Sequence, residues 1–586
     1  MFEKKLTSLM DNIQITENQF VKEGLKQSSV VHSEEGAVKY STSGNKFVDN
    51  FASISKFKEL RSYEDIAKDM ELLWSIDPKD TIKLAIYIRI ITRKTQVMIN
   101  CNKSETLEVQ RGAGLKHESI MRMIWLGINH PKVFMLNLPL FIAAGSWKDI
   151  ITMMNLDLQY NGWENRKLNW NFLVKIIFAG IANPSTRNLV LKYLPTIRTN
   201  NKCRTLESQA DTLIGRYLAI RMFPKTNSED KIYAYKQYRQ LKASGTAHEW
   251  QQQISKELYD EINFGNIAGR ALSLLVGSKF LENHNLTNKY TQWIESQPIA
   301  KFTGFVHELF APLGSGYYCN HIAAYKEKTI NAQFKQLISL GKSASKLLVV
   351  RDTSSSMTAK AIGCKQSSYD IAKAMALYFS ESLTGPFSNC FAEFADTHKL
   401  REWVGKTPCD KYINDKSQAY GGTNFQSVID LFISLKEKGV KESDFPEGII
   451  CLSDGEFARQ GINKVSNFNL AIARLLDSGF SKEYVDNFKI ILWDIPNEFY
   501  DRRPATKFED FADASNFYYI SGYDTSIITF ILGGDNPTFK APKNAEELFK
   551  ECLNQDLLNR VKIINIKRDN IKKNKNKKNH EKKVNN

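Results

Sequence analysis

The stretch KLLVVRDTSSSM, residues 346–357, decides the fold of the C-terminal half of this 586-residue chain. Its first part is a run of apolar residues typical of a buried strand, and the polar residues that follow mark the end of that strand. Asp352, Ser354 and Ser356 alternate along the polar part. The stretch therefore predicts a strand that ends in a turn, with three oxygen-bearing side chains directed toward one point.

Four more strand-like runs follow this stretch: NCFAEFAD (389–396), GIICLSD (448–454), FKIILWD (488–494) and FYYISG (517–522). Helical stretches such as SYDIAKAMALYFSESL and NFQSVIDLFISLKEK lie between them. Strands that alternate with helices indicate an α/β doubly wound, mostly parallel sheet. Ligands of such sheets bind beyond the carboxyl ends of the strands, which is where Asp352 and Asp454 fall.

Two further motifs supply oxygen ligands of the same kind. GGTNF (421–425) places Thr423 after two glycines that permit an unusual turn, and CLSDGEF (451–457) places Asp454 after a buried strand. Hydroxyl and carboxylate oxygens are the ligands of hard cations such as Mg²⁺. The predicted metal ligands are Asp352, Ser354, Ser356, Thr423 and Asp454. The alternative is a domain whose loops keep these residues without binding a metal.

In this order the motifs resemble the metal-ion-dependent adhesion site of a von Willebrand factor A domain, and the resemblance covers about 345–535. It implies that the two serines and the threonine reach Mg²⁺ or another divalent cation directly or nearly so, and that the aspartates bind partly through water. It also implies that the last coordination position is left for an oxygen of a partner protein. Ser355 departs from the family, which often has glycine there.

The N-terminal half has a different pattern of apolar residues. From about residue 46 to 340, apolar residues recur at steps of three and four, as in ESIMRMIWLGINH (118–130) and NFLVKIIFAGIA (171–182). Many amphipathic helices with short links favour an α-solenoid of HEAT-like helical repeats. The expected domains are a polar N-terminal arm (1–45), a helical-repeat domain (46–344), an A-like domain (345–540), and a C-terminal helix with a basic disordered tail (541–586).

The formal charge of +16 is unevenly distributed along the chain. Residues 187–242 carry a net charge of +8, and residues 562–586 carry another +8, so the rest is near neutral. A basic excess gathered in two places points to a polyanionic partner, and nucleic acid is the usual one.

Two segments within 187–242 supply candidate RNA-binding residues. Arg198, Lys202 and Arg204 lie in a polar stretch after a proline, where they could follow a phosphate backbone. In DKIYAYKQYRQLK the helical spacing places five cations and tyrosines on one face, suited to phosphates and stacked bases. These five are Lys231, Tyr235, Tyr238, Arg239 and Lys242. The alternative is a solvated basic face whose tyrosines pack on the next helix.

The combination of a helical part and an A-like domain resembles the Ro autoantigen family, whose helical part is the TROVE module. The shared stretches are GAGLKHESIMRMIWLGINHPKVFMLNLPLFIAAGSWKDII, KYLPTIRTNNK and EDKIYAYKQYRQLKASGTAHEW, and the resemblance covers roughly 50–535. It implies helical repeats that close into a ring, single-stranded RNA ends inside the ring, and structured small RNAs on its outer surface. Viral, phage and plant relatives of unknown function share the layout.

Other features of the sequence exclude several classes of protein. The longest apolar runs fall short of the roughly 18 residues needed to span a bilayer, and the start MFEKKLTSLMDN lacks the apolar core of a signal peptide. The eight cysteines show no C-x-x-C spacing, which favours reduced, mostly buried thiols. We therefore expect a cytoplasmic protein without a membrane partner.

Three functional hypotheses follow from these features. The first is a non-catalytic RNA-binding protein that holds single-stranded or misfolded RNA on its helical part, with the metal site as a second docking surface. The second is a scaffold that recruits a protein partner through the metal and has no role in RNA binding. A metal-dependent hydrolase is the least favoured, because no nucleophile or general base accompanies the predicted metal ligands.

Overall fold

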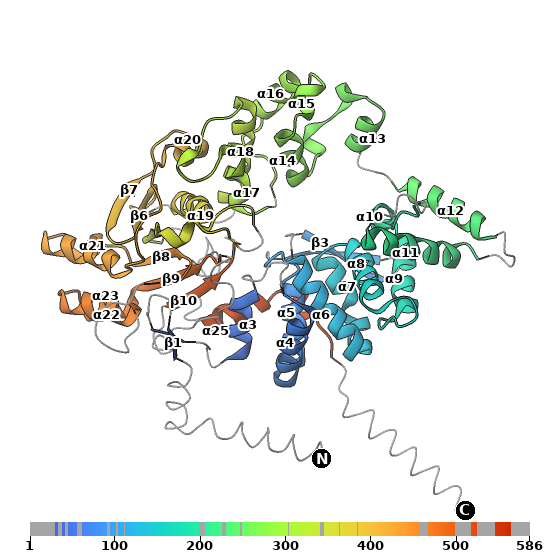
Figure 1. Ribbon diagram of the computed structural model, residues 1–586, viewed down its shortest axis with the longest axis horizontal. Coiled ribbons are helices and arrows are strands. Elements are labelled where there is room, and N and C mark those ends of the chain that lie inside the picture. The colour runs from blue at the N-terminus through green and yellow to red at the C-terminus, as the bar shows by residue number, and fades with distance from the viewer. Residues whose placement is uncertain are drawn as a thin grey trace, which may run out of the picture. The chain divides into compact units, whose positions relative to one another are not determined.

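A computed structural model of the chain provides the fold (Figure 1). It describes residues 30–32, 38–40, 45–54, 61–90, 94–100, 103–109, 112–198, 205–224, 230–245, 249–302, 304–339, 345–361, 364–383, 385–455, 457, 467–497, 517–523 and 545–563. Within this part of the chain, no helix is both long and apolar enough to cross a membrane.

The described residues form two compact units. A helical unit is drawn from Arg61–Gln252 and Leu553–Asn586, and a sheet unit from Met1–Leu60 and Gln253–Cys552. A helical N-terminal region is therefore followed by an α/β sheet region, as the sequence predicted. The helices between residues 253 and 338 belong to the same compact unit as the sheet.

The helical unit is a set of short helices. They are α4 (Tyr63–Ile76), α5 (Pro78–Tyr87), α6 (Lys116–Asn129), α7 (Pro131–Ala144), α8 (Lys148–Asn161), α9 (Trp170–Ala182), α10 (Arg187–Tyr193), α11 (Leu206–Met222), α12 (Asp230–Ser244) and α26 (Asp556–Asn559). Helix α13 (Glu249–Ser255) spans the boundary between the two units. The helices expected at 118–130 and 171–182 are α6 and α9.

One part of the helical unit is not helical, contrary to the sequence prediction for 46–340. Strands β3 (Lys94–Asn100) and β4 (Lys103–Glu108) form an antiparallel hairpin that packs on α7. Val97 and Leu107 are buried, while Gln96 between Thr95 and Val97 is exposed. Because the adjacent Val97 and Met98 are both buried, β3 lacks the strict alternation that signals a half-buried strand, and the helical period of the preceding residues was extended through it.

Besides its main sheet, the sheet unit contains further helices and 3-10 turns. Its helices are α3 (Lys46–Ile54), α14 (Gly269–Gly277), α15 (Phe280–Asn283), α16 (Thr287–Glu295), α17 (Val306–Phe310), α18 (Ala324–Ile338), α19 (Ser368–Ser382), α20 (Pro408–Asn414), α21 (Gln426–Glu437), α22 (Asn467–Asp477), α23 (Lys482–Asn487) and α25 (Ala545–Leu553). Its 3-10 turns are η4 (Tyr259–Glu261), η5 (Phe264–Asn266), η6 (Ala311–Leu313), η7 (Gly316–Tyr318), η8 (Ser355–Thr358) and η9 (Glu442–Asp444).

The main sheet has six strands in the order β10-β9-β8-β5-β6-β7. Its strands are β5 (Leu347–Asp352), β6 (Cys390–Phe394), β7 (His398–Glu402), β8 (Gly448–Ser453), β9 (Lys489–Asp494) and β10 (Phe517–Ser521). All neighbouring strands are parallel except β6 and β7, which are antiparallel. This is the doubly wound sheet that the sequence predicted, with a charged edge strand, HKLRE, that it did not.

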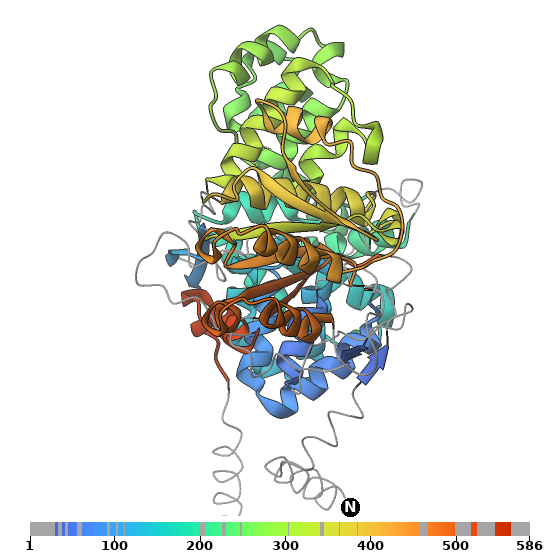
Figure 2. The same cartoon turned by 90° about the vertical axis from the view of Figure 1, so that its left-hand side faces the viewer.

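Helices cover both faces of this sheet (Figure 1), and the turned view shows the same layers (Figure 2). Leu348 and Val350 of β5 belong to a buried core that also contains residues of α21, α22 and α23. Helix α19 packs against β5 from the other face. Both faces of the central strands are apolar because neither face meets water.

The two ends of the chain also differ from the sequence predictions. Strands β1 (Val30–His32) and β2 (Val38–Tyr40) form a short antiparallel pair inside the predicted loose arm. The single C-terminal helix expected within 541–586 is divided into α25 and α26, because Gln555 takes an extended conformation before α26. The predicted tail at 565–586 lies outside the described residues.

Candidate metal centre and nucleic-acid surface

The predicted metal ligands gather where the strand order of the sheet reverses. Strand β5 is followed along the chain by β6 on one side, whereas β8, its neighbour on the other side, is followed by β9. The carboxyl ends of β5 and β8 therefore flank a switch point, where open α/β sheets bind ligands. Asp352 is the last residue of β5, and Asp454 directly follows β8.

Hydrogen bonds fix the carboxylate of Asp352 between the two strands. Its Oδ1 accepts a hydrogen bond from the Ser354 amide at 2.8 Å, and its Oδ2 accepts one from the Ser453 hydroxyl at 2.5 Å. The Oγ atoms of Ser354 and Ser356 are 3.0 Å apart. Asp352 and Ser354 are buried, whereas Ser356 is partly exposed, so the side of the site nearest Ser356 is the accessible one.

The glycine turn before Thr423 is tied to this serine turn. Gly421 has a φ of +72°, and a Cβ atom there would lie 2.2 Å from a carboxylate oxygen of Asp396. Only glycine fits such a turn without strain. The amide and hydroxyl of Ser355 both donate to the Gly421 carbonyl, at 3.1 and 3.0 Å. Ser355, the residue that departs from the A-domain pattern, thus adds a bond between the two turns.

The hydroxyl of Thr423 is the clearest test of whether these residues suit a metal. The side chain is 1% exposed, and no residue in the described part of the chain hydrogen-bonds its Oγ1 atom. A buried hydroxyl without a partner costs about 1–3 kcal/mol. A hard cation at this position would give the oxygen a partner, and the five predicted ligands offer hydroxyl and carboxylate oxygens of the type that Mg²⁺ prefers.

Asp454 is linked to the serine turn by a residue that the sequence did not single out. The buried amide of Asn497 donates to Asp454 Oδ2 at 3.0 Å and to the Ser356 carbonyl at 3.4 Å. Ser453 was also missed, although it adjoins Asp454 in the CLSDGEF motif. Neighbourhood along the chain could have suggested Ser453, whereas no spacing rule connects Asn497 to residues more than 40 positions away.

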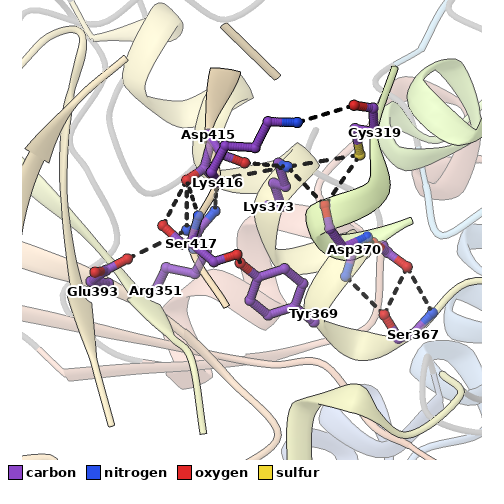
Figure 3. A network of polar contacts seen from close by, with 11 residues as sticks. Cys319, Arg351, Ser367, Tyr369, Asp370, Lys373, Glu393, Asp415, Lys416 and Ser417 are labelled. Carbon is purple, nitrogen blue, oxygen red and sulfur yellow. Dashed lines mark hydrogen bonds and ion pairs between the residues drawn. The ribbon is translucent and has the colours of Figure 1, made fainter. Parts of the chain in front are cut away.

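A second polar cluster lies on the α19 side of β5 (Figure 3). The guanidinium of Arg351 donates to Asp415 at 2.6 and 3.4 Å, and Lys373 donates to the Asp415 carbonyl at 2.9 Å. Asp370 accepts hydrogen bonds from Ser315 and from the Gly316 amide, at 2.6 and 2.7 Å. The bonds of Asp370 hold the segment before α18 on α19, and those of Asp415 join β5 and α19 to the residue that follows α20, so both sets have a structural role.

The charges in this cluster determine its pKa values. Burial alone would raise the pKa of Asp415, but the charge and hydrogen bonds of Arg351 outweigh it and hold that pKa well below its usual range. Burial lowers the pKa of Lys373, although Asp415 opposes the shift. Asp415 therefore stays ionised in the folded protein over the whole neutral range.

The predicted RNA-binding residues fall partly outside the described chain. Lys202 and Arg204 lie in the segment 199–204, outside the described residues. Arg198 is about one-third exposed, and its guanidinium lies 4.0 Å from the carboxylate of Asp211. Its charge is therefore accessible but partly compensated.

On α12 the structure corrects the predicted shared face. Tyr238 is fully buried, and its hydroxyl donates to the Pro195 carbonyl at 2.9 Å. The ammonium of Lys242 donates to the carbonyls of Lys192 and Leu194, at the end of α10, and burial lowers its pKa. Both side chains hold α12 on α10, because 3.6 residues per turn direct these positions inward. Lys231 and Arg239 are exposed, and Tyr235 is half-buried.

The fold and the site together define the class of protein: a helical region followed by a doubly wound domain of the A type, with oxygen side chains at its switch point. Residues 346–584 match a family described as a domain of unknown function (DUF7788). Among curated proteins, none matches the chain.

The structure is also similar to the crystal structure of the Ro (RSR) protein of Deinococcus radiodurans. The match covers 86% of this chain and 99% of the other, with 12% sequence identity and a TM-score of 0.35. The likeness supplies no correspondence between individual residues, and the fold rests on the strand order and helices of this chain.

Proposed function

We propose that this chain is a non-catalytic, cytoplasmic RNA-binding protein of the Ro type. The observation that carries the proposal is the exposed basic surface of α12. Lys231, Lys236 and Arg239 are exposed there, and the sequence from Lys231 to Ser244 contains four basic residues and no acidic one. Such a run of exposed cations suits the phosphates of single-stranded or misfolded RNA.

The tyrosines of α12 would contribute to the same surface. Tyr233 is 40% exposed and Tyr235 is half-buried, next to the exposed cations. Aromatic rings among cations give stacking surfaces for unpaired bases, and such contacts tolerate many sequences. We therefore expect a preference for single-stranded over duplex RNA and little preference among sequences.

The switch-point site would be a second docking surface. Asp352, Ser354, Ser356, Thr423 and Asp454 would hold Mg²⁺ or another divalent cation. A bound cation would supply a coordination position for a carboxylate oxygen of a protein partner. The partly exposed Ser356 marks the side from which such a partner would approach.

The RNA-binding proposal is tested by titrating a labelled single-stranded RNA with the full chain at several salt concentrations. Lys231→Ala/Arg239→Ala should weaken binding and make it less dependent on salt, by roughly 0.7 in the logarithmic slope for each phosphate that is no longer neutralised. The control is Lys438→Ala/Lys482→Ala, which removes two exposed lysines of the sheet unit and should leave binding unchanged. Wild-type protein without RNA affinity at low salt would refute the proposal.

A protein-interaction scaffold without an RNA role is the second candidate. The hydrogen bonds that join the serine turn to Gly421 and the end of β5 to Ser453 favour it, because they hold oxygen side chains at one end of the sheet in a way that would suit a metal. The two candidates separate in one experiment. A scaffold would capture a protein from a lysate in the presence of Mg²⁺ and lose it with Asp352→Ala, while showing no affinity for RNA at any salt concentration.

A further inference from the structure

Cys364 lies in a tight loop between the candidate metal centre and α19. The Ala361 amide donates to the Gln366 carbonyl at 2.9 Å, and the Cys364 amide donates to the Ala361 carbonyl at 3.1 Å. Lys360 and Ser367 close the loop as an antiparallel bridge. The loop leaves the Cys364 side chain partly exposed, so reagents in solution can reach it.

A histidine from another element is positioned against this thiol. The Nε2 atom of His307, on α17, lies 3.7 Å from the Sγ atom of Cys364. The His307 ring is stacked on Phe305 with centroids 5.7 Å apart and meets the edge of Tyr523 at 5.5 Å. The His307 carbonyl also accepts a hydrogen bond from Gln366 at 2.8 Å. These contacts fix the ring so that its nitrogen faces the sulfur.

We propose that Cys364 is a modification site, a thiol that is activated by His307 and reacts with small electrophiles, hydroperoxides in particular. The thiol proton passes to His307 Nε2, and the sulfur attacks one peroxide oxygen. The O–O bond breaks, the sulfur is oxidised to a sulfenic acid, and the leaving oxygen takes the proton from the imidazolium. This inference does not depend on RNA or metal binding.

Among the charged and titratable groups around Cys364 and His307, one favours the thiolate of Cys364 and the others have hydrogen-bond or ion-pair partners of their own. Lys365, next to Cys364, is exposed, and its positive charge favours the thiolate. The carboxylate of Glu308, next to His307, accepts a hydrogen bond from the Phe305 amide and forms an ion pair with Arg270. The hydroxyl of Tyr523 donates to the Pro496 carbonyl at 3.3 Å.

The other described cysteines provide an internal comparison. All six are free thiols, and Cys319, Cys409, Cys451 and Cys552 are buried. Cys390 is partly exposed like Cys364, but burial and the nearby charge of Glu402 raise its pKa. If access alone controlled reactivity, Cys364 and Cys390 would react alike.

The test measures the alkylation rate of each thiol against pH. The full chain, with Cys101→Ser and Cys203→Ser so that the six described thiols remain, is treated with iodoacetamide between pH 5.5 and 9.5 and mapped by mass spectrometry. Cys364 should titrate at least about one pH unit below the usual value near 8.5, and Cys390 above it. A Cys364 midpoint at or above 8.5 would overturn the proposal.

His307→Gln separates activation from access. In this variant the Cys364 midpoint should rise to about 8.5 or higher, and trapping of the sulfenic acid by dimedone after peroxide treatment should fall by about tenfold. A folded variant that keeps the low midpoint would contradict the role of His307. If the variant does not fold, the wild-type comparison of Cys364 with Cys390 still decides, because both thiols are in the same molecule.

Discussion

Thr423 and Ser355 show which features of the candidate metal centre could be predicted from single residues. Thr423 was chosen from its place after two glycines, and the structure buries its hydroxyl without a hydrogen-bond partner among the described residues. Ser355 looked like a defect in the turn, yet its hydroxyl joins the turn to Gly421. Residue types and their order led to the prediction of these ligands, and the structure places Asp352 and Asp454 at the ends of neighbouring strands. The supporting hydrogen bonds depend on which turns meet in space.

Thr423→Val should reveal the cost of the unpartnered hydroxyl. The variant removes a buried polar atom, so without Mg²⁺ its unfolding free energy should rise by about 1 kcal/mol. It should also lose the stabilisation that Mg²⁺ gives the wild type, whereas Thr423→Ser should keep it. Denaturant unfolding with and without Mg²⁺ measures both effects. Equal stabilisation of wild type and Thr423→Val by Mg²⁺ would contradict the assignment.

Asp415 makes folding sensitive to acid. Its pKa is lowered in the folded state, so the stability it contributes is fully present above the unfolded value of about 3.9 and is lost as the pH falls toward the folded value. Denaturant unfolding at pH 7, 4 and 2.5 should therefore show a stability loss below pH 4. Asp415→Asn should flatten that loss and cost about 3–5 kcal/mol at pH 7, because it leaves Arg351 buried with its charge less well compensated.

A control for this prediction comes from the surface of the same unit. Asp430 pairs with Arg474 at a partly exposed position. Asp430→Asn should cost less than about 1 kcal/mol, because surface ion pairs contribute little. If both variants behaved alike, the buried cluster would not have the stabilising role assigned to it.

At the scale of elements, strands and helices with strong apolar patterns were predictable. The runs that became β5, β8 and β9 are buried on both faces, so their sequence is continuously apolar. Strand β7 was missed because it is a charged strand at the edge of the sheet. Charged side chains on an edge strand hinder pairing with other molecules, but they also remove the apolar pattern by which a strand is recognised in a sequence. The β3–β4 hairpin was missed because the preceding helical period was extended through it.

Helix α12 shows why spacing alone cannot assign an RNA-binding face. The five predicted residues lie on one side of the helix, but that side is wide. Part of it packs on α10, and the rest is exposed to solvent. Tyr238 lies at the contact, and Arg239 is exposed. The position of the neighbouring helix, which the sequence does not reveal, decides which of the five residues can meet a ligand.

Tyr238→Phe should therefore affect stability and not RNA binding. It removes the hydrogen bond to the Pro195 carbonyl and should cost about 1 kcal/mol of unfolding free energy. The RNA dissociation constant should stay within a factor of about two of the wild-type value. A large loss of RNA affinity in a folded Tyr238→Phe variant would restore the stacking role expected from the sequence.

At the scale of the whole molecule, the proposed RNA and metal sites belong to separate compact units. Asp352→Asn should abolish the stabilisation by Mg²⁺ and leave RNA affinity unchanged, because α12 belongs to the other unit. Ser355→Ala, in the same turn, should keep Mg²⁺ binding and is the matched control. Thermal unfolding with Mg²⁺ and the RNA titration give the two readouts. Loss of RNA affinity with Asp352→Asn would show that the two surfaces are one.

The division into units also shows that the periodicity of apolar residues does not reveal where a compact unit begins. A change from helical to strand-like periodicity near residue 345 was visible, and it marks where the sheet begins. Helices α17 and α18 precede that change but pack on α19 and α20, and the η7 turn between them is bonded to Asp370 of α19. Periodicity identifies elements, whereas compact units depend on contacts between distant segments.

The most direct test of the proposed RNA-binding surface is ultraviolet cross-linking of single-stranded RNA to the full chain, followed by mass spectrometry of the linked peptides. We predict cross-links within 231–239, on Tyr233 or Tyr235, and their disappearance in Lys231→Ala/Arg239→Ala. RNA cross-linked reproducibly to other peptides while 231–239 remains unmodified, or no cross-linking at low salt, would contradict the proposal.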